Sequence, residues 1–547
     1  MKSMILNTFL ACTGLLFCLN ARAMELSLNG QWEYKSNVED TWHKGTVPGC
    51  VHLNLPELRH LDAGNVKVQS VNKVLKGEQG RIISYVTEPD GNFLLSEMDN
   101  ITFRDNHSGK SAPIIVDPGQ KYQTMEGFGF ALTGGSAQMM IQMSPQARHE
   151  LIEELFGKDE GQAGISCIRL SLGASDLNSF VFSYDDMPEG KEDWTLSQFS
   201  LAQDLNDVVP VMKEILAVNP DIFIISSPWS APVWMKESRD VRGGKLRRDC
   251  YEVYADYFVK YIKAMAAHGI HVNAGTLQNE PLNNRNTPSM PWDPQDQLDF
   301  IADYLGPALR NGNLDTDIIL FDHNCDRIDY PLAILADPRV SEYVSGSGFH
   351  HYMGDLSAMA QMHLARPDKD IYFTEQMLID RSFSKSGRIA ASVKRVVIDV
   401  TRAWSRNIVL WNLASDRNAG PHTDNGGCPF CYGAVTIEGD EVDRNLAFYT
   451  ISHISSFVPR GSVRIYSTDV DDPAIMTCND EQHPEVVRAN YYSKSSVLPN
   501  VAFLTPEGKT VLIVTNTTSS DQTVEIQYKG KYADVFLKSG AVGTYIW

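Results

Sequence analysis

The sequence predicts an α/β fold: a (β/α)8 TIM barrel with an antiparallel β-sandwich attached as a side domain. Three observations support this prediction. Short apolar runs recur eight times between residues 127 and 413, and amphipathic helical stretches separate them. After about residue 461 the chain changes to short alternating strands punctuated by turn residues. The 547 residues exceed the roughly 250 that a barrel needs, which leaves room for further domains.

The predicted barrel strands are short runs of apolar, often β-branched residues. They cover residues 127–132, 165–172, 221–227, 272–277, 318–322, 346–351, 371–374 and 408–413. The predicted helices have apolar residues at three- and four-residue spacing and cover residues 144–156, 205–217, 251–267, 295–310 and 390–404. Eight alternating units favour a closed barrel over an open sheet, which would need a glycine-rich phosphate loop after its first strand.

The flanks of the barrel predict the sandwich. Strands are expected at residues 81–86, 101–103 and 114–116 before the barrel, and at 511–515, 522–527, 533–537 and 543–547 after it. We therefore expect residues 81–117 to contribute strands to the side domain, residues 118–460 to form the barrel, and residues 461–547 to form the C-terminal sandwich.

The N-terminus has the features of a signal peptide, predicted to cover residues 1–23. Lys2 is followed by a mostly apolar run at residues 5–19, and Ala21-Arg22-Ala23 supplies a cleavage pattern. An uncleaved anchor and a lipoprotein signal are the alternatives. No later run of 18 apolar residues follows, so we expect no membrane span and a secreted or periplasmic protein.

Residues 24–80 are expected to form a partly ordered appendage. Two short stretches in it, residues 26–32 and 47–52, resemble the opening of the sugar-binding domain of β-mannosidases.

Charge and cysteine content narrow the function classes. The net charge of −20, from 48 basic and 68 acidic residues, argues against nucleic acid as the main partner. Of nine cysteines, seven remain after the predicted cleavage, an odd number. Cys428-Pro-Phe-Cys431 lacks the second ligand pair of a zinc site, so it predicts either a local loop disulfide or two free thiols. We expect no cofactor.

Two glutamates at predicted strand ends indicate the chemistry. Glu280 follows the fourth strand in the run Gln278-Asn279-Glu280-Pro281, and Glu375 follows the seventh. Active sites of such barrels lie at the C-terminal ends of the strands. Glycoside hydrolysis needs one carboxylic acid to protonate the leaving oxygen and a second carboxylate at the anomeric carbon. Asn279 is placed to donate to a substrate hydroxyl beside the reacting centre.

The sequence resembles glycoside hydrolase family 30, the family of glucosylceramidases and β-1,6-glucanases, from about residue 81 to residue 547. The motifs that carry the resemblance begin at Gly127-Phe-Gly-Phe, Ile168-Arg169, Ser227-Pro-Trp229, Gln278-Asn-Glu-Pro281, His350-His-Tyr352, Thr374-Glu375-Gln376 and Trp411-Asn412. The resemblance implies a retaining mechanism with Glu280 as acid/base and Glu375 as nucleophile. It also implies that a substrate contact is made by each of Arg169, Trp229, Asn279, His350, Tyr352 and Asn412.

Elementary geometry supports several of these roles. Residues two apart on a strand share a face, so His350 and Tyr352 point together and His351 points away. Adjacent histidines that diverge, with no third ligand in view, do not predict a metal site. Tyr352 can hold a neighbouring carboxylate ionised by a hydrogen bond. Arg169 can do the same by its charge, or else form a salt bridge that closes the barrel.

The tryptophans allow two interpretations. Trp229 offers a flat face to a sugar ring, whereas Trp234 fits either a sugar contact or the core.

Two departures from the glucosylceramidase pattern leave the sugar open. Gly134 replaces an Asp after the first motif, so a contact to the outer hydroxyls of the sugar is either missing or supplied elsewhere. Gly420-Pro-His422-Thr423 replaces a segment with a Trp, and His422 or Asp424 is the candidate substitute.

We therefore expect a secreted retaining β-glycosidase that acts on a β-linked glucan, oligosaccharide or glycolipid, most plainly a β-1,6-glucan or a glucosylceramide-like β-glucoside. A β-xylosidase or β-fucosidase of the same family and an inactive carbohydrate-binding protein are the alternatives.

The two glutamates are expected to lie about 5–5.5 Å apart, the separation of retaining enzymes. Two carboxyl groups at that distance cannot both ionise easily, so the pKa of one must rise. Because Glu375 has the more evident partners in Arg169 and Tyr352, the sequence predicts that Glu280 holds the shared proton.

Overall fold

A computed structural model describes residues 80–109, 112–379, 388–468 and 498–547. Residues 1–81 form a separate compact unit, for which only short strands are described, the longest being β3 (Gly30–Lys35) and β4 (His43–Val47). Apart from such strands, the predicted signal peptide and appendage lie outside the described residues. No helix within the described ranges is long and apolar enough to cross a membrane.

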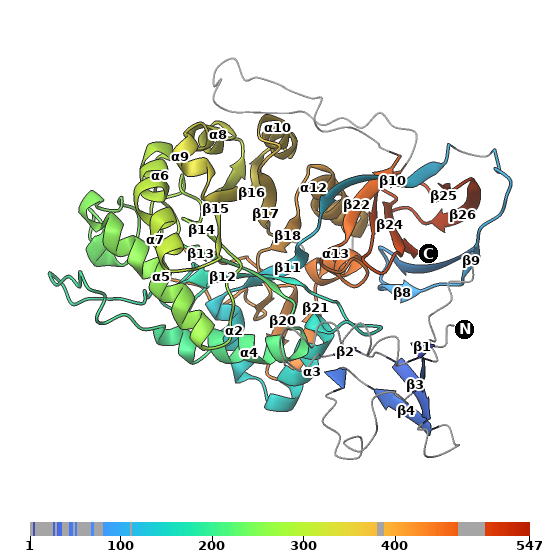
Figure 1. Ribbon diagram of the computed structural model, residues 1–547, viewed down its shortest axis with the longest axis horizontal. Helices are drawn as coiled ribbons and strands as arrows, with labels where there is room; N and C mark the ends of the chain where they lie inside the picture. The colour runs from blue at the N-terminus through green and yellow to red at the C-terminus, as the bar shows by residue number, and fades with distance from the viewer. Residues whose placement is uncertain are drawn as a thin grey trace. The chain divides into compact units, whose positions relative to one another are not determined.

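Eight parallel strands form the barrel, as the sequence predicted (Figure 1). They are β11 (Gly127–Leu132), β12 (Cys167–Leu172), β13 (Phe223–Pro228), β14 (Ala274–Thr276), β15 (Asp317–Cys325), β16 (Val344–Gly354), β17 (Asp370–Glu375) and β18 (Asn407–Leu410). From β11 to β17 each strand pairs with the next along the chain, and β18 pairs with β11. Two isolated bridges, Ile371 to Ser405 and Met377 to Trp411, close the seam between β17 and β18.

Helices surround the strands (Figure 1). The longer helices are α2 (Gly134–Gln142), α3 (Pro145–Phe156), α4 (Val208–Val218), α5 (Tyr251–Ala267), α10 (Ser357–Ala365) and α13 (Leu446–Ser455). Shorter ones are α8 (Asp329–Leu335) and α9 (Pro338–Ser341). Ser144 caps α3 by accepting from the amide of Ala147, and Pro145 occupies the first helical position, where it costs no hydrogen bond.

Two predicted helices contain a π-helical turn. The first consists of α6 (Pro294–Phe300), a π segment (Ile301–Leu305) and α7 (Gly306–Asn311). The second consists of α11 (Arg388–Val393), a π segment (Lys394–Ile398) and α12 (Asp399–Arg402). The sequence predicted both helices as continuous, because a single inserted residue leaves the apolar spacing almost unchanged.

The side domain joins strands from both ends of the chain, as predicted. Its sheet has the order β26-β25-β10-β22-β23-β24-β27-β7-β8, with β9 beside β7. The strands before the barrel are β7 (Arg81–Thr87), β8 (Ser96–Glu97), β9 (Ile101–Thr102) and β10 (Ile114–Thr124); those after it are β22 (Val463–Ser467), β23 (Asn500–Leu504), β24 (Thr510–Thr515), β25 (Gln522–Tyr528), β26 (Lys531–Leu537) and β27 (Val542–Ile546). One pair differs from the prediction, because β10 runs parallel to β25.

Buried contacts join the side domain to the barrel. His453 of α13 is fully buried, and its two ring nitrogens contact the hydroxyls of Thr544 at 2.9 Å and Thr87 at 2.8 Å. These threonines lie on β27 and β7, which flank each other in the sheet. A small three-stranded sheet of β19 (Ala414–Ser415), β20 (Val435–Glu438) and β21 (Glu441–Arg444) follows the last barrel strand.

Candidate active site

The C-terminal ends of the barrel strands gather a buried network of charged and polar side chains. Arg169 on β12, Asn279 and Glu280 after β14, His350 and Tyr352 on β16, and Glu375 on β17 all belong to it. Except for Tyr352, which is 40% exposed, these residues are at most 8% exposed. Six of the eight predicted site residues therefore lie together.

Glu375 is held by a cation and a hydroxyl. Its Oε2 accepts a hydrogen bond from Arg169 Nη1 at 2.6 Å, and its Oε1 accepts one from the Tyr352 hydroxyl at 2.9 Å. Both partners were predicted, Tyr352 from strand geometry and Arg169 from its charge. Burial and the charge of Glu375 raise the pKa of Tyr352 well above its usual value, so the phenol keeps its proton and remains a donor.

Asp322, at the kink of β15, anchors the network and was not predicted. Its Oδ2 accepts from Arg169 Nη2 at 2.8 Å, and its Oδ1 contacts His350 Nε2 at 2.9 Å. The hydroxyls of Ser227 and Thr276 donate to the same Oδ2. Burial opposes ionisation, but the Arg169 and His350 charges outweigh it and lower the Asp322 pKa well below its usual range.

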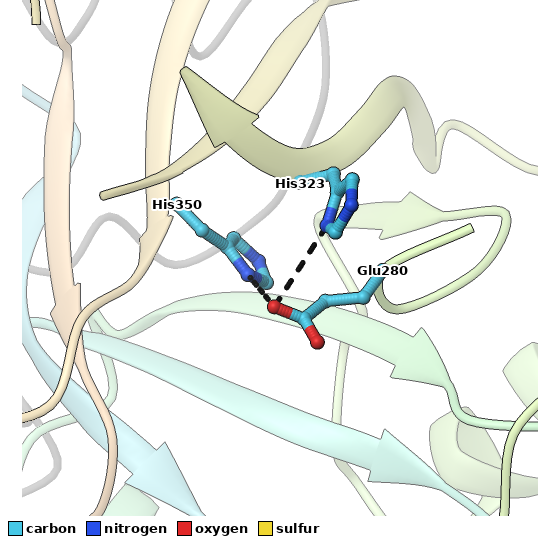
Figure 2. Close-up of side chains that lie close together, drawn as sticks. All are labelled: Glu280, His323 and His350. Carbon is cyan, nitrogen blue, oxygen red and sulfur yellow. Dashed lines mark hydrogen bonds and ion pairs between the residues drawn. The ribbon is translucent and has the colours of Figure 1, made fainter. Parts of the chain in front are cut away.

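Glu280 lies between two histidines (Figure 2). Its Oε1 is 3.2 Å from His350 Nδ1 and 3.8 Å from His323 Nδ1, and its Oε2 accepts from Asn283 at 2.6 Å. The backbone of Glu280 has a φ of 48°, and that of Asp322 has 56°, both in the left-handed region that non-glycine residues rarely adopt. The amide of Glu280 donates to the Asp322 carbonyl at 3.0 Å, which couples the two strained positions.

The predicted protonation of Glu280 is wrong for this structure. Burial alone would raise its pKa, but His323 and His350 lower it well below the usual range. The pKa of His350 rises to about 9, because the charges of Glu375, Asp322 and Glu280 outweigh the cost of burying the imidazolium. The sequence argument missed these contacts, since His350 approaches Glu280 from a strand that is distant in the chain.

His350 also limits the separation of the two glutamates. Its Nδ1 is 3.2 Å from Glu280 Oε1 and 3.7 Å from Glu375 Oε1. The two Oε1 atoms are therefore at most about 7 Å apart, which includes the retaining range and excludes most of the inverting range.

The Trp229 ring offers no open face to a sugar, and Asn412 does not contact the two glutamates. Trp229 is 1% exposed, since its ring stacks on Trp411 and lies 4.9 Å from the Arg169 guanidinium, so it does not present an open face. Asn412 uses its amide internally, accepting from Ser136 Oγ at 2.5 Å and donating to the Cys431 carbonyl at 3.4 Å. Asn412 therefore contacts the loop that carries the disulfide, and not the two glutamates.

Trp234 is a core residue, the second of its two predicted roles. It is 3% exposed, and its indole nitrogen donates to Asp185.

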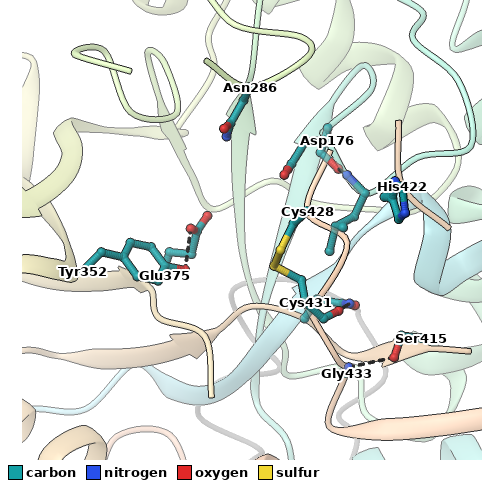
Figure 3. The surroundings of a disulfide bond; sticks show 12 residues. Asp176, Asn286, Tyr352, Glu375, Ser415, His422, Cys428, Cys431 and Gly433 are labelled. Carbon is teal, nitrogen blue, oxygen red and sulfur yellow. Dashed lines mark hydrogen bonds between the residues drawn. A yellow bond between two sulfur atoms is a disulfide. The ribbon is translucent and has the colours of Figure 1, made fainter. Parts of the chain in front are cut away.

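Asp176 is a second carboxylate that the sequence analysis missed. It is 5% exposed, and no other residue in the described part of the chain donates to its carboxylate. Burial, followed by the charges of Glu375 and Glu280, raises its pKa to about 8. In the view of Figure 3, Asp176 lies between Glu375 and His422. Its position seven residues after Arg169, in a loop that follows β12, was the available signal.

The loop around Asp176 explains the first of the two departures, at Gly134. A side chain at Gly134 would meet Asn178 Nδ2 at 1.9 Å, so Asn178 fills the place of the missing residue. His422 turns its Nδ1 to the carbonyl of Thr423, and Asp424 is exposed. Neither substitute proposed for the second departure contacts the glutamates in the described residues.

Cys428 and Cys431 form a disulfide, which selects one of the two sequence interpretations. The disulfide lies below Asp176 in Figure 3, and Cys431 packs with Leu177, Trp229 and Trp411. The loop therefore supports the wall of the site. The free cysteines in the described ranges, Cys167, Cys250 and Cys325, are all buried.

Comparisons with known proteins agree with this geometry. The model of the glycosyl hydrolase family 30 TIM-barrel domain matches residues 125–458, and that of the family 30 β-sandwich domain matches residues 485–545. An endo-1,6-β-D-glucanase of Neurospora crassa is 31% identical over 70% of this chain and 82% of its own length. The lysosomal acid glucosylceramidase of Mus musculus is 27% identical, over 81% of this chain and 84% of its own. The solved structure of the endo-β1,6-glucanase BT3312 superposes with a TM-score of 0.74 at 31% identity, covering 86% of this chain and 99% of that one.

Proposed function

The chain belongs to glycoside hydrolase family 30, and we propose that this glycoside hydrolase cleaves β-1,6-linked glucan with retention of configuration. One observation carries the proposal. Glu280 and Glu375 have different partners but share the Nδ1 atom of His350, which keeps them within the reach of one anomeric centre.

Glu375 is the proposed nucleophile. Arg169 donates to one carboxylate oxygen and the Tyr352 hydroxyl to the other, and these two hydrogen bonds fix the orientation of the attacking carboxylate. Attack on the anomeric carbon forms a glycosyl ester and breaks the bond to the leaving oxygen. As the ester forms, Glu375 loses its charge, and Arg169 stays paired with Asp322.

Glu280 is the proposed acid and base. Glu280 is an anion beside the His350 imidazolium, so the proton that the leaving oxygen needs starts on His350 Nδ1 and passes through Glu280 Oε1, 3.2 Å away. In the second step Glu280 takes a proton from water, whose oxygen attacks the ester carbon and releases Glu375. Asp322 holds His350 by its other nitrogen and so keeps Nδ1 directed at Glu280.

Two groups support recognition of the sugar hydroxyls. Asp176 has a carboxylate that no other described residue binds, and the buried indole N–H of Trp229 also lacks a partner among the described residues. A buried polar group without a partner is costly, and a sugar hydroxyl satisfies it. The preference for β-1,6 linkages is supported by the relatives named above, among which endo-1,6-β-glucanases are the most similar by identity.

The test is hydrolysis of a linear β-1,6-glucan, compared with separate assays on β-1,3-glucan, xylan and glucosylceramide. We expect oligosaccharide products from the β-1,6-glucan, and the first product seen by proton NMR should be the β-anomer. The Glu375→Gln variant is the control for contaminating activity. An α-anomer as first product contradicts retention, and faster turnover of xylan or glucosylceramide contradicts the proposed substrate.

We also propose that the enzyme is exported. Lys2, the apolar run at residues 5–19 and the Ala21-Arg22-Ala23 pattern support this. N-terminal sequencing of the protein from the culture medium or periplasm should start at Met24, whereas an intact Met1 on that protein contradicts cleavage.

A further inference from the structure

We propose that Glu280, His323 and His350 form a binding site for a zinc-class divalent cation, and that the bound ion inhibits the enzyme. The ligand atoms are Glu280 Oε1, His323 Nδ1 and His350 Nδ1, which lie within 4.8 Å of one another (Figure 2). The inhibition, though not the binding, rests on the proposed function of Glu280.

The distances fit a tetrahedral ion. Ligands about 2.0–2.1 Å from zinc are separated from each other by roughly 3.3 Å. Glu280 Oε1 is 3.2 Å from His350 Nδ1 and 3.8 Å from His323 Nδ1. The two histidine nitrogens lie within 4.8 Å of each other, so they must approach by at most about 1.5 Å to share one ion with Glu280, and a water completes the fourth position.

His323 carries the independent signal. His323 is 8% exposed, and its Nδ1 atom is buried without a hydrogen-bond partner in the described part of the chain. The 3.8 Å gap to Glu280 Oε1 is too long for a hydrogen bond. A buried polar atom without a partner is costly, and a cation bound between His323 Nδ1 and Glu280 Oε1 would satisfy it.

Asp322 supplies the outer support that histidine ligands require. A metal-binding histidine commonly donates its other ring N–H to a carboxylate, which fixes the ring and its tautomer. His350 does this with Asp322 Oδ1 at 2.9 Å, leaving Nδ1 for the ion. Binding releases the Nδ1 proton of His350 to solvent and leaves the Nε2–H bond in place.

The surrounding charge favours a dication. Asp322, Glu375 and Glu280 surround the site, and Arg169 is the permanent cation bonded to the first two. Two nitrogens and one carboxylate suit zinc or cobalt, whereas magnesium prefers an all-oxygen set.

Occupation of the site removes the acid/base. The ion takes Oε1 of Glu280, the oxygen that otherwise contacts the His350 proton, so the leaving oxygen loses its proton donor. We expect zinc to abolish turnover of unactivated glucan and EDTA to restore it.

The experiment uses the full-length, EDTA-treated enzyme titrated with Co²⁺ and followed by visible absorption, with Zn²⁺ affinity from calorimetry. We expect one intense tetrahedral cobalt spectrum that Zn²⁺ displaces and Mg²⁺ does not. His323→Ala and His323→Gln, the second keeping the side-chain volume, should weaken Zn²⁺ binding by at least about tenfold, since even loss of an outer partner costs about 10–100-fold. Circular dichroism confirms that each variant is folded.

His149→Ala is the matched control, because His149 and Glu153 form an exposed pair at 3.4 Å on α3 that resembles an adventitious surface site. It should leave the cobalt spectrum unchanged. Equal Zn²⁺ affinity in wild type and both His323 variants overturns the metal site. That result does not affect the proposed hydrolysis of glucan. An enzyme that is inactive on all β-glycosides but keeps the His323-dependent spectrum overturns the proposed function and supports the metal site.

Discussion

The inner face of the barrel has two layers built by the same strands with opposite chemistry. The lower layer is apolar and almost fully buried, and consists of Cys167, Phe223, Ile225, Ala274, Ile319, Tyr372 and Val409. Two residues further along, Cys167 is followed by Arg169, Ile225 by Ser227 and Ala274 by Thr276, all in the charged upper layer.

The difference between the layers shows what each requires. The lower layer needs matching volumes, as in the parallel stacking of the Phe223 and Tyr372 rings with centroids 6.4 Å apart. The upper layer needs a partner for every charge, because an unpaired buried ion costs several kcal/mol. Changes in the upper layer should therefore depend on pH and on substrate chemistry, while changes in the lower layer should affect stability alone.

The largest expected effect is on catalysis by the upper layer. Glu375→Gln removes the attacking oxygen and should lower turnover by about 10⁶-fold, the order found when another enzyme loses its nucleophile. Good and poor leaving groups should suffer alike, measured with dinitrophenyl β-glucoside and β-1,6-glucan. Substantial activity on either substrate would assign the nucleophile elsewhere.

Glu280→Gln should separate the two substrates. Turnover of β-1,6-glucan should fall by about 10²–10⁴-fold, the usual contribution of a general acid. Formation of the glycosyl-enzyme from a dinitrophenyl glycoside needs no proton and should be retained as a burst. Added azide should then speed turnover and yield the β-glycosyl azide. If azide has no effect and glucan turnover is normal, Glu280 is not the acid/base.

The next largest effects are on the free energy of unfolding, which should respond differently to pH in the two layers. Arg169→Met leaves Asp322 and Glu375 buried without their cation, a loss of about 3–5 kcal/mol. Ile319→Ala in the lower layer should cost about 2–5 kcal/mol by creating a cavity. The Arg169→Met loss should shrink below about pH 4, where carboxyl groups protonate in the unfolded chain, whereas the Ile319→Ala loss should not change. Denaturant unfolding at several pH values measures both, and equal pH profiles would contradict the comparison.

The effect expected to be smallest at neutral pH is the pH dependence of stability from His350, which develops only as the pH rises toward 9. Its pKa is raised to about 9 in the folded state, so its stabilisation is complete below the ordinary value near 6.5 and is lost as the pH rises through 9. The loss should reach about 3.5 kcal/mol, at about 1.4 kcal/mol for each of about 2.5 pKa units. Comparing the unfolding of wild type and His350→Asn from pH 6 to 10 measures it.

His453 is the control of opposite sign for that prediction. Burial lowers its pKa to about 3, so its folded state resists protonation and wild type should lose stability as the pH falls below about 6.5. His453→Asn should remove that acid-side loss and leave the alkaline side unchanged. For the His350 prediction itself, the contradicting result is a difference in unfolding free energy between wild type and His350→Asn that stays constant from pH 6 to 10. That result would mean that His350 is neutral in the folded protein.

The fold followed from local patterns in the sequence. Strands such as β11 and helices such as α5 were predicted from apolar spacing, because alternation and three- and four-residue periodicity are properties of short stretches. The ends of the parallel strands share one face of a barrel, so Glu280 and Glu375 could be placed together before their contacts were known. The shared face of His350 and Tyr352 followed from the two-residue period of a strand.

Tertiary structure alone decided which partner each charge has. Asp322 joins Arg169 to His350, and His323 faces Glu280, only because strand β15 bends at residues with left-handed backbone conformations. A pKa depends on burial and on charges from several strands, which no local pattern contains. The sequence therefore determined where the carboxylates gather, and the packing of separate strands decided that Glu280 is held as an anion by His323 and His350.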